Sequence, residues 1–189
     1  MNKCVVLFIF AAASTSSAFA AIDFTPAIGE RELDGIKFSQ LIFHDKGRRV
    51  TYEQPRGWTY SGDSSYIRFI PPGTSLAVGE ISQVPIPAAQ NFDDEATKTW
   101  LLNQVLTGLP SESREAKLIS VEKNPLMING QDTLEITVTY TLHGENYLQS
   151  VLFLHLTDVQ LNFRFISRKT DFPKLHQAFR GSLCSLQWL

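Results

Sequence analysis

The sequence has few cysteines, no long hydrophobic run and no strong excess of charge of either sign. Only two cysteines occur in 189 residues, and 17 basic side chains are nearly balanced by 19 acidic ones. So weak a net charge offers no basic surface to nucleic acid or to an anionic membrane. The scarcity of cysteine excludes a scaffold held together by disulfides, and a chain of this length can bury enough surface to fold without them.

Recognisable catalytic motifs are also missing. The chain has no Gly-x-Ser-x-Gly elbow, no His-Glu-x-x-His or Cys-x-x-Cys pair and no glycine-rich phosphate loop. The four histidines, His44, His143, His155 and His176, are dispersed and are interpreted as surface or hydrogen-bonded side chains. The sequence therefore predicts no catalytic residue, no metal ligand and no cofactor, and we expect a protein that is not an enzyme.

The first 20 residues have the three parts of an export signal. Lys3 is the basic start, residues 4–13 (CVVLFIFAAA) are a short apolar run, and residues 18–20 form the small-x-small pattern Ala-Phe-Ala. The apolar run is about half of the roughly 20 residues that a membrane-spanning helix needs. We therefore expect cleavage between Ala20 and Ala21, no membrane anchor after cleavage, and a periplasmic or secreted protein.

Cleavage would also change the cysteine chemistry. It removes Cys4 and leaves Cys184 alone, so the mature chain could form no intramolecular disulfide. It removes Lys3 as well, which leaves 16 of the 17 basic residues against 19 acidic ones and a formal net charge of −3 instead of −2. Cys184 is then a buried small side chain, an intermolecular partner or a free thiol. Its residue type favours burial, but its place away from the apolar stripe of the last helix makes burial less secure; Cys184 is assigned as a free thiol, with its exposure left open.

The mature chain has the length of one domain, predicted at 36–189 after a lead-in of little structure at 21–35. Apolar alternation and turn residues predict strands at 36–44, 49–53, 66–70, 76–84, 116–123, 134–142, 147–156 and 159–165. Tight turns join the last three strands, which predicts an antiparallel meander. In the strand 134–142, Glu135 and the threonines alternate with apolar residues and are assigned to a polar face.

Two helices are predicted. The first begins at the acidic residues 93–95 and ends at Gly108; the acidic start could bind a cation, but helix capping explains it better. The second begins near Asp171, and its apolar side chains recur at helical spacing, so this stripe should pack on the sheet. The stripe consists of Phe172, Leu175, Phe179, Leu183 and Leu186.

Three aromatic residues are the candidate recognition surface. Trp58, Tyr60 and Tyr66 flank or occupy a predicted loop. Exposed loops often carry binding functions, and aromatic side chains often anchor partners. The alternative is that these rings belong to the core and rim of a sheet.

The segment Tyr52-Glu-Gln-Pro55-Arg-Gly57-Trp58 resembles the y-x-x-P-x-x-W pattern near the start of PsbP-like domains. Residues 172–188 are similar to the closing segment of the same family, which includes DcrB-like bacterial exported proteins. The resemblance extends over residues 36–188. It implies an α+β fold in which an antiparallel sheet lies between helices on both faces, an α/β/α sandwich. Most members of the family are binding or accessory proteins rather than enzymes.

Three functions stay open at this level. The first is an exported, non-enzymatic accessory or binding protein whose partner is another envelope or secreted protein. The second is a periplasmic chaperone or an immunity-like inhibitor of a dedicated protein partner. The third is an unrecognised hydrolase. A family fold does not choose among them, because one fold supports many functions.

Overall fold

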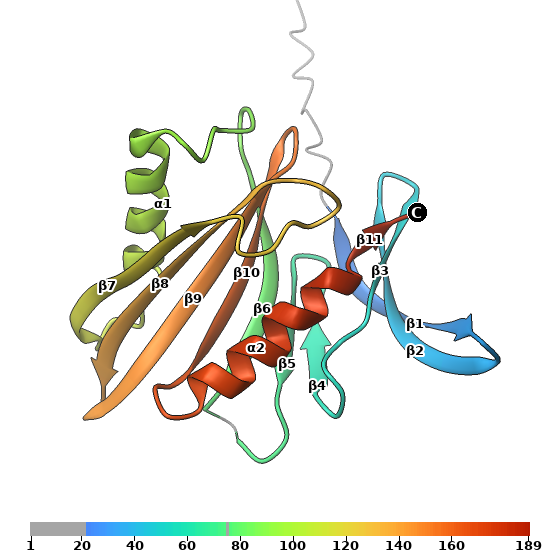
Figure 1. Ribbon diagram of the computed structural model, residues 1–189, viewed down its shortest axis with the longest axis horizontal. Helices are drawn as coiled ribbons and strands as arrows, with labels where there is room; N and C mark the ends of the chain where they lie inside the picture. The colour runs from blue at the N-terminus through green and yellow to red at the C-terminus, as the bar shows by residue number, and fades with distance from the viewer. Residues whose placement is uncertain (1–21, 75) are drawn as a thin grey trace, which may run out of the picture.

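The computed structural model describes residues 22–189 with the exception of residue 75 (Figure 1). The expected signal peptide at 1–20 and the cleavage site between Ala20 and Ala21 lie outside the described residues. Within the described part of the chain, neither helix has the length and apolar character needed to cross a membrane.

Antiparallel strands dominate the described residues and form two sheets, where the sequence predicted one. The seven-stranded sheet has the order β4-β5-β6-β10-β9-β8-β7 and consists of Thr59–Gly62, Tyr66–Ile70, Val78–Pro85, Val159–Arg168, Glu145–His155, Thr133–Leu142 and Arg114–Lys123. The four-stranded sheet has the order β1-β2-β3-β11 and consists of Asp23–Leu33, Ile36–Asp45, Arg48–Tyr52 and Gln187–Trp188. Strands β8, β9 and β10 pair in chain order.

The expectation of little structure at 21–35 was wrong, because Asp23–Leu33 forms β1. This strand contains a proline, a glycine and several charged residues, so its sequence lacks the apolar alternation that predicts a strand. Pro26 falls where the register between β1 and β2 is irregular, a place in which a strand tolerates proline. At Gly29, a Cβ would meet the end of the Ile42 side chain on β2, which would have to move to make room for it.

The last helix, α2 (Phe172–Ser182), packs across β10 and the strands beside it (Figure 1). The predicted apolar stripe is confirmed, although the α-helix ends at Ser182 and a 3-10 turn (Leu183–Ser185) carries the chain on to β11. Four of its members are buried and Leu175 is half-buried against the same core. Phe179 lies at the centre, with its ring 5.7 Å from that of Phe165 and 6.3 Å from that of Trp58.

The other helix, α1 (Glu95–Thr107), starts as predicted. The Asp94 carboxylate accepts a hydrogen bond of 3.1 Å from the backbone N–H of Thr97, and this bond lowers the pKa of Asp94. The acidic residues at this end therefore include a helix cap. Leu101 and Val105 of α1 are buried in a second apolar cluster with residues of β8 and β9.

The contact between Gly79 of β6 and α2 gives a stability prediction. A Cβ at Gly79 would lie 2.7 Å from the Phe179 ring, so Gly79→Ala must displace α2 and should lower the free energy of unfolding by about 1–3 kcal/mol. Urea unfolding measures this loss. The control is Gly181→Ala, whose Cβ meets nothing within 4 Å and which should stabilise α2 by about 0.5–1 kcal/mol. Equal stability of the two variants would contradict this packing.

Candidate functional site

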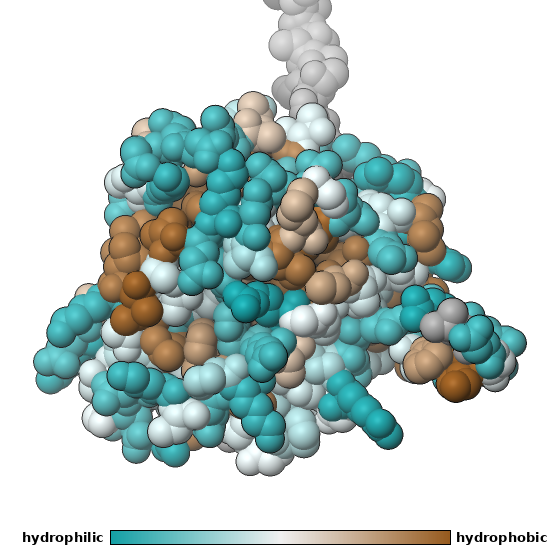
Figure 2. Space-filling view, in the orientation of Figure 1, coloured by the Kyte–Doolittle hydropathy of each residue, from teal (hydrophilic) through white to brown (hydrophobic). Residues whose placement is uncertain are grey.

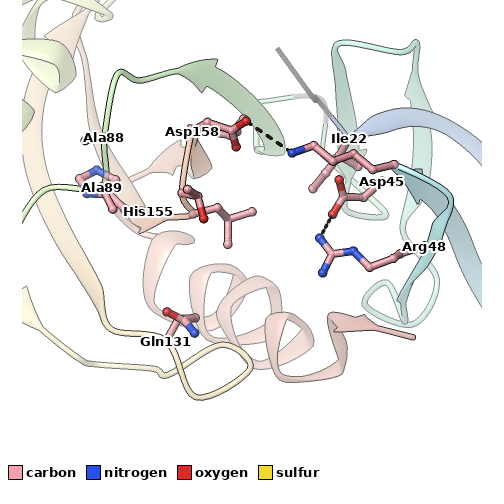
Figure 3. A pocket seen from close by; sticks show the side chains of 12 residues that line it. Ile22, Asp45, Arg48, Ala88, Ala89, Gln131, His155 and Asp158 are labelled. Carbon is pink, nitrogen blue, oxygen red and sulfur yellow. Dashed lines mark hydrogen bonds and ion pairs between the residues drawn. The ribbon is translucent and has the colours of Figure 1, made fainter. Parts of the chain in front are cut away.

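A cleft of about 650 Å³ lies where turns of the two sheets approach each other (Figure 3). The β2–β3 turn supplies Asp45, Lys46 and Arg48 on one side. The β9–β10 turn, with His155 and Asp158, lies on the other side. Polar and apolar side chains mix in its walls, and charged groups face it from both sheets. The cleft is therefore a candidate site for binding or catalysis.

The charged groups of the cleft are paired with one another. Lys46 Nζ lies 3.4 Å from Asp158 Oδ2 and joins the two turns. The Asp45 carboxylate accepts a hydrogen bond from the Arg48 guanidinium (Figure 3). It accepts another, of 3.0 Å, from Trp188 Nε1 of β11. These contacts hold the turns in place and leave little unbalanced charge for binding a charged substrate.

His155 is likewise engaged on both sides of its ring. Its Nδ1 lies 3.2 Å from both the backbone nitrogen and the carbonyl oxygen of Gln90, and its Nε2 lies 3.1 Å from Gln160 Oε1. Gln160 in turn donates to Gln104 of α1 at 3.0 Å. Both ring nitrogens of His155 are therefore held by contacts within the protein. His155 therefore anchors loops and is not placed for catalysis.

The sequence missed a buried charged cluster centred on Glu135, which was assigned to a polar face of β8. Its side chain is 3% exposed because α2 covers that face. Glu135 accepts hydrogen bonds from the Ser150 hydroxyl, from His176 Nε2 at 2.7 Å and from Arg180 Nη1 at 2.9 Å. Burial raises the pKa of Glu135, but the three hydrogen bonds outweigh it, so the pKa of this carboxyl lies below its ordinary value.

The Glu135 cluster attaches α2 to β8 and does not resemble a catalytic arrangement. His176 and Arg180, one helical turn apart on α2, both reach the same carboxylate. The Ser150 hydroxyl and His176 Nε2 both make their hydrogen bonds to Glu135 Oε1, and no hydrogen bond joins the hydroxyl to the imidazole. No group of three side chains able to hold a metal ion occurs in the described part of the chain.

Two of the three candidate recognition aromatics keep partial exposure, and one does not. Trp58 is only 6% exposed because its ring stacks in the core against Phe179, so its assignment to a recognition surface was wrong. Tyr60 is half-buried beside the same core. Tyr66 lies under the Arg68 guanidinium, which is 4.8 Å from the centre of its ring. Cys184 is exposed, although its residue type favours burial.

The hairpin of β1 and β2 projects from the body of the protein as a two-stranded arm, defined here as residues 27–40 (Figure 1). Strand β3 pairs with residues 41–45 of β2, whereas residues 36–40 pair only with β1. Strand β1 is itself the edge of its sheet. Among residues 22–74 and 76–189, no further strand pairs with the arm. Its backbone N–H and C=O groups are therefore free along both outer edges.

The arm carries exposed apolar side chains. Ile28 is 71% exposed and Ile36 60%, and Figure 2 shows an apolar surface at the far end of the hairpin. Cross-strand pairing places Ile36 and Phe38 on one face, where Arg31 lies 6.0 Å from the Phe38 ring. The other face carries Ile28 and an ion pair of 2.9 Å between Lys37 and Glu30.

Comparison with known proteins finds no matching family model and no matching curated protein. Among solved structures, the chain is similar to a protein of unknown function from Pseudomonas aeruginosa, with 16% identity and a TM-score of 0.49 over 85% of this chain and 96% of the other. A Bacteroides thetaiotaomicron structure has 14% identity and a TM-score of 0.47, over 73% of this chain and 44% of the other.

Cyanobacterial PsbP from Synechocystis is also among the similar structures, with 14% identity and a TM-score of 0.46 over 100% of this chain and 99% of the other. The chain thus has the PsbP-like resemblance that its motifs suggested. The resemblance is loose and concerns the fold alone, so no role of these proteins is transferred to this chain.

The Glu135 cluster predicts a pH-dependent loss of stability. At pH 7, Glu135→Gln should lower the free energy of unfolding by about 1.5–3 kcal/mol, because hydrogen bonds to a charged group are lost. Since the native pKa is depressed, this contribution is present above the ordinary pKa of 4.5 and disappears as the pH falls through the lower native value. Urea unfolding at pH 7 and below pH 4 measures both effects.

The matched control for this variant is Glu122→Gln. Glu122 lies directly across from Glu135 on β7, but it is exposed. This control should change the free energy of unfolding by no more than about 0.5 kcal/mol at either pH. A Glu135→Gln effect that grew on acidification would have the wrong sign for a depressed native pKa.

Proposed function

We propose that this protein is an exported, non-enzymatic accessory or binding protein whose β1–β2 arm docks on another envelope or secreted protein. The observation that carries the proposal is the arm itself. A two-stranded hairpin without further packing is at best marginally stable in water. Residues 36–40 of β2 and their partners on β1 extend beyond the rest of the sheet, and they therefore gain from a protein that covers them.

The free edges of the arm favour a partner that supplies an extended strand. Backbone N–H and C=O groups along an unpaired edge can add a strand from another chain, and nearby side chains then select the partner. Ile36 and Phe38 offer an apolar face to such a partner. The opposite edge of the large sheet is a poorer template, because β7 has two register irregularities against β8, which bend an edge strand.

A catalytic function has less support. The ionised groups of the cleft are paired within the protein, and both nitrogens of His155 have partners. The export signal at 1–20 supports the envelope or the exterior as the place of action.

We also propose the finer fold class, a PsbP-like α/β/α sandwich. Residues Val151 and Phe153 of β9 join the cluster that contains α1 side chains, whereas Leu152 and Leu154 join the cluster that contains α2 side chains. Successive residues of a strand point to opposite faces, which supports one helix on each face of the large sheet.

The docking proposal is tested by photo-crosslinking in the exporting cell. A benzophenone amino acid at Ile28 or Ile36 should give an adduct with one protein of the envelope or exterior. The matched control is Met127, which is 52% exposed on a loop outside the arm and should give no such adduct. Ile36→Lys should weaken the recovered complex at least tenfold, about 1.4 kcal/mol, by placing a charge in the apolar face.

Three results would contradict docking by the arm. The first is the same adduct from Met127 as from the arm positions, and the second is no protein adduct from either arm position. The third is an adduct only with a second copy of this chain, which would assign the arm to self-association. Turnover of a substrate by the purified protein alone would contradict the non-enzymatic assignment.

A further inference from the structure

Strand β7 is an edge of the large sheet, and in the described part of the chain no further strand pairs with its outer side. None of its ten residues is buried. Leu118 is 46% exposed, Ile119 57% and Val121 39%, and Figure 2 shows an apolar area where β7 and α1 lie in Figure 1. Exposed apolar side chains beside free backbone N–H and C=O groups favour a partner that adds a strand.

An extra residue in β7 changes how its side chains alternate. The pairing with β8 shifts between Leu118 and Ser120, where β7 has one residue more than its neighbour, which is a β-bulge. Leu118 and Val121 therefore lie on one face, although they are three positions apart. Their partners on β8 belong to the apolar cluster that contains α1 side chains. The exposed apolar groups of β7 thus extend the α1 face of the sheet.

The other face of β7 carries two exposed charges of opposite sign, Lys117 and Glu122. Their neighbours on β8 are Thr139 and Glu135, and α2 covers this face at Glu135. Neither Lys117 nor Glu122 forms an ion pair with another described residue. Both charges are therefore available to a partner on the outer side of the strand.

A second copy of β7 complements this pattern. An antiparallel pair related by a two-fold axis between Ile119 and Ser120 places Leu118 of each copy opposite Val121 of the other. The same pairing places Lys117 of each copy opposite Glu122 of the other. Apolar pairs then lie on the α1 face and ion pairs on the α2 face, and both kinds stabilise antiparallel strands. The bulge that makes β7 a poor template for an ordinary strand lies at the axis in both copies.

Other registers of the same pair are disfavoured. A shift of two residues in one direction places Glu115 opposite Glu122, two like charges, and a shift in the other direction places Leu118 opposite Lys123. A shift of one residue pairs Leu118 with Ser120, which lies on the other face of the sheet. The pattern of charges and apolar side chains therefore selects a single register.

Side chains of α1 extend the contact beyond the strand. Gln104 and Gly108 line a cleft with residues of β6 and β10, so that flank of α1 is directed away from β7. Leu102 and Leu106 lie on the opposite flank and are half-buried against the α1 cluster. Adjacent strands are about 4.8 Å apart. In the symmetric pair, the leucine flanks of the two α1 helices therefore face each other across the β7 strands.

We propose that β7 is a dimerisation strand, through which two copies of this chain join their large sheets into one antiparallel sheet. The partner is a second copy because the charged and apolar positions complement each other about a two-fold axis. An interface of one strand pair and two helix flanks is small, so we expect a Kd of about 1–100 µM. The surface is separate from the arm, and docking by the arm neither requires nor excludes it.

The test is sedimentation equilibrium of the protein purified from the exporting cell, at about 1–300 µM. The mass should rise from that of one chain to that of two. Lys117→Glu and Glu122→Lys each place like charges opposite one another, and each should weaken dimerisation by at least about tenfold. The variant with both changes restores the ion pairs with their signs exchanged, so its Kd should return to within about threefold of the parent value.

The matched control is Lys174→Glu, the same change of charge at an exposed position of α2, which should leave the Kd unchanged. The Tm of each variant at about 1 µM, where the chain is monomeric, should lie within about 2 °C of the parent value, so a loss of dimer is no loss of fold. The mass of one chain over the whole range overturns the proposal. A Kd that neither single reversal changes, or that the double reversal leaves weakened, overturns it as well.

Discussion

The arrangement of the two sheets depends on the packing of Phe179. Its ring fills a site that Gly79 leaves open and contacts Trp58, Phe69 and Phe165 from three strands or loops. This contact fixes α2 on the large sheet. The chain then leaves α2 by a short 3-10 turn and enters the small sheet as β11.

Hydrogen bonds along this route connect the sheets. Ser182 Oγ lies 2.6 Å from the Tyr52 hydroxyl, and Ser185 Oγ accepts from the Glu53 backbone N–H at 2.8 Å. The Leu189 N–H then donates to the Arg49 carbonyl at 2.8 Å. Residues near the C-terminus thus hold β3 against the body, and β3 in turn holds β2, from which the arm extends. The orientation of the arm therefore depends on a helix at the other end of the sequence.

Local signals predicted most of the elements. Asp94 is a helix cap, and the pairs Asn129–Gly130 and His143–Gly144 adopt the positive φ angles that tight turns need. The apolar alternation of β8 correctly placed Leu134 and Ile136 in the core. These signals are short-range, and they need no knowledge of what packs above the strand.

The failures concern residues whose surroundings come from distant parts of the chain. From its strand pattern alone, Glu135 is predicted to face solvent. Its partners His176 and Arg180 belong to α2 and lie 41 and 45 residues further along the chain. The sequence pattern predicts an exposed loop position for Trp58, but Phe165 of β10 and Phe179 of α2 pack against its ring. Strand β1 has weak alternation because much of it meets solvent on both faces, so no buried side selected apolar residues there.

Strand β11 lies far along the chain from β1, β2 and β3, and this separation sets when the small sheet can be completed during synthesis. Strand β3 is exposed along one edge until residues 187 and 188 pair with it. A chain that emerges from its N-terminus first therefore cannot finish the small sheet before residues 187 and 188 have been synthesised. The small sheet is therefore completed later in synthesis than the strands of the large sheet, all of which lie before residue 169.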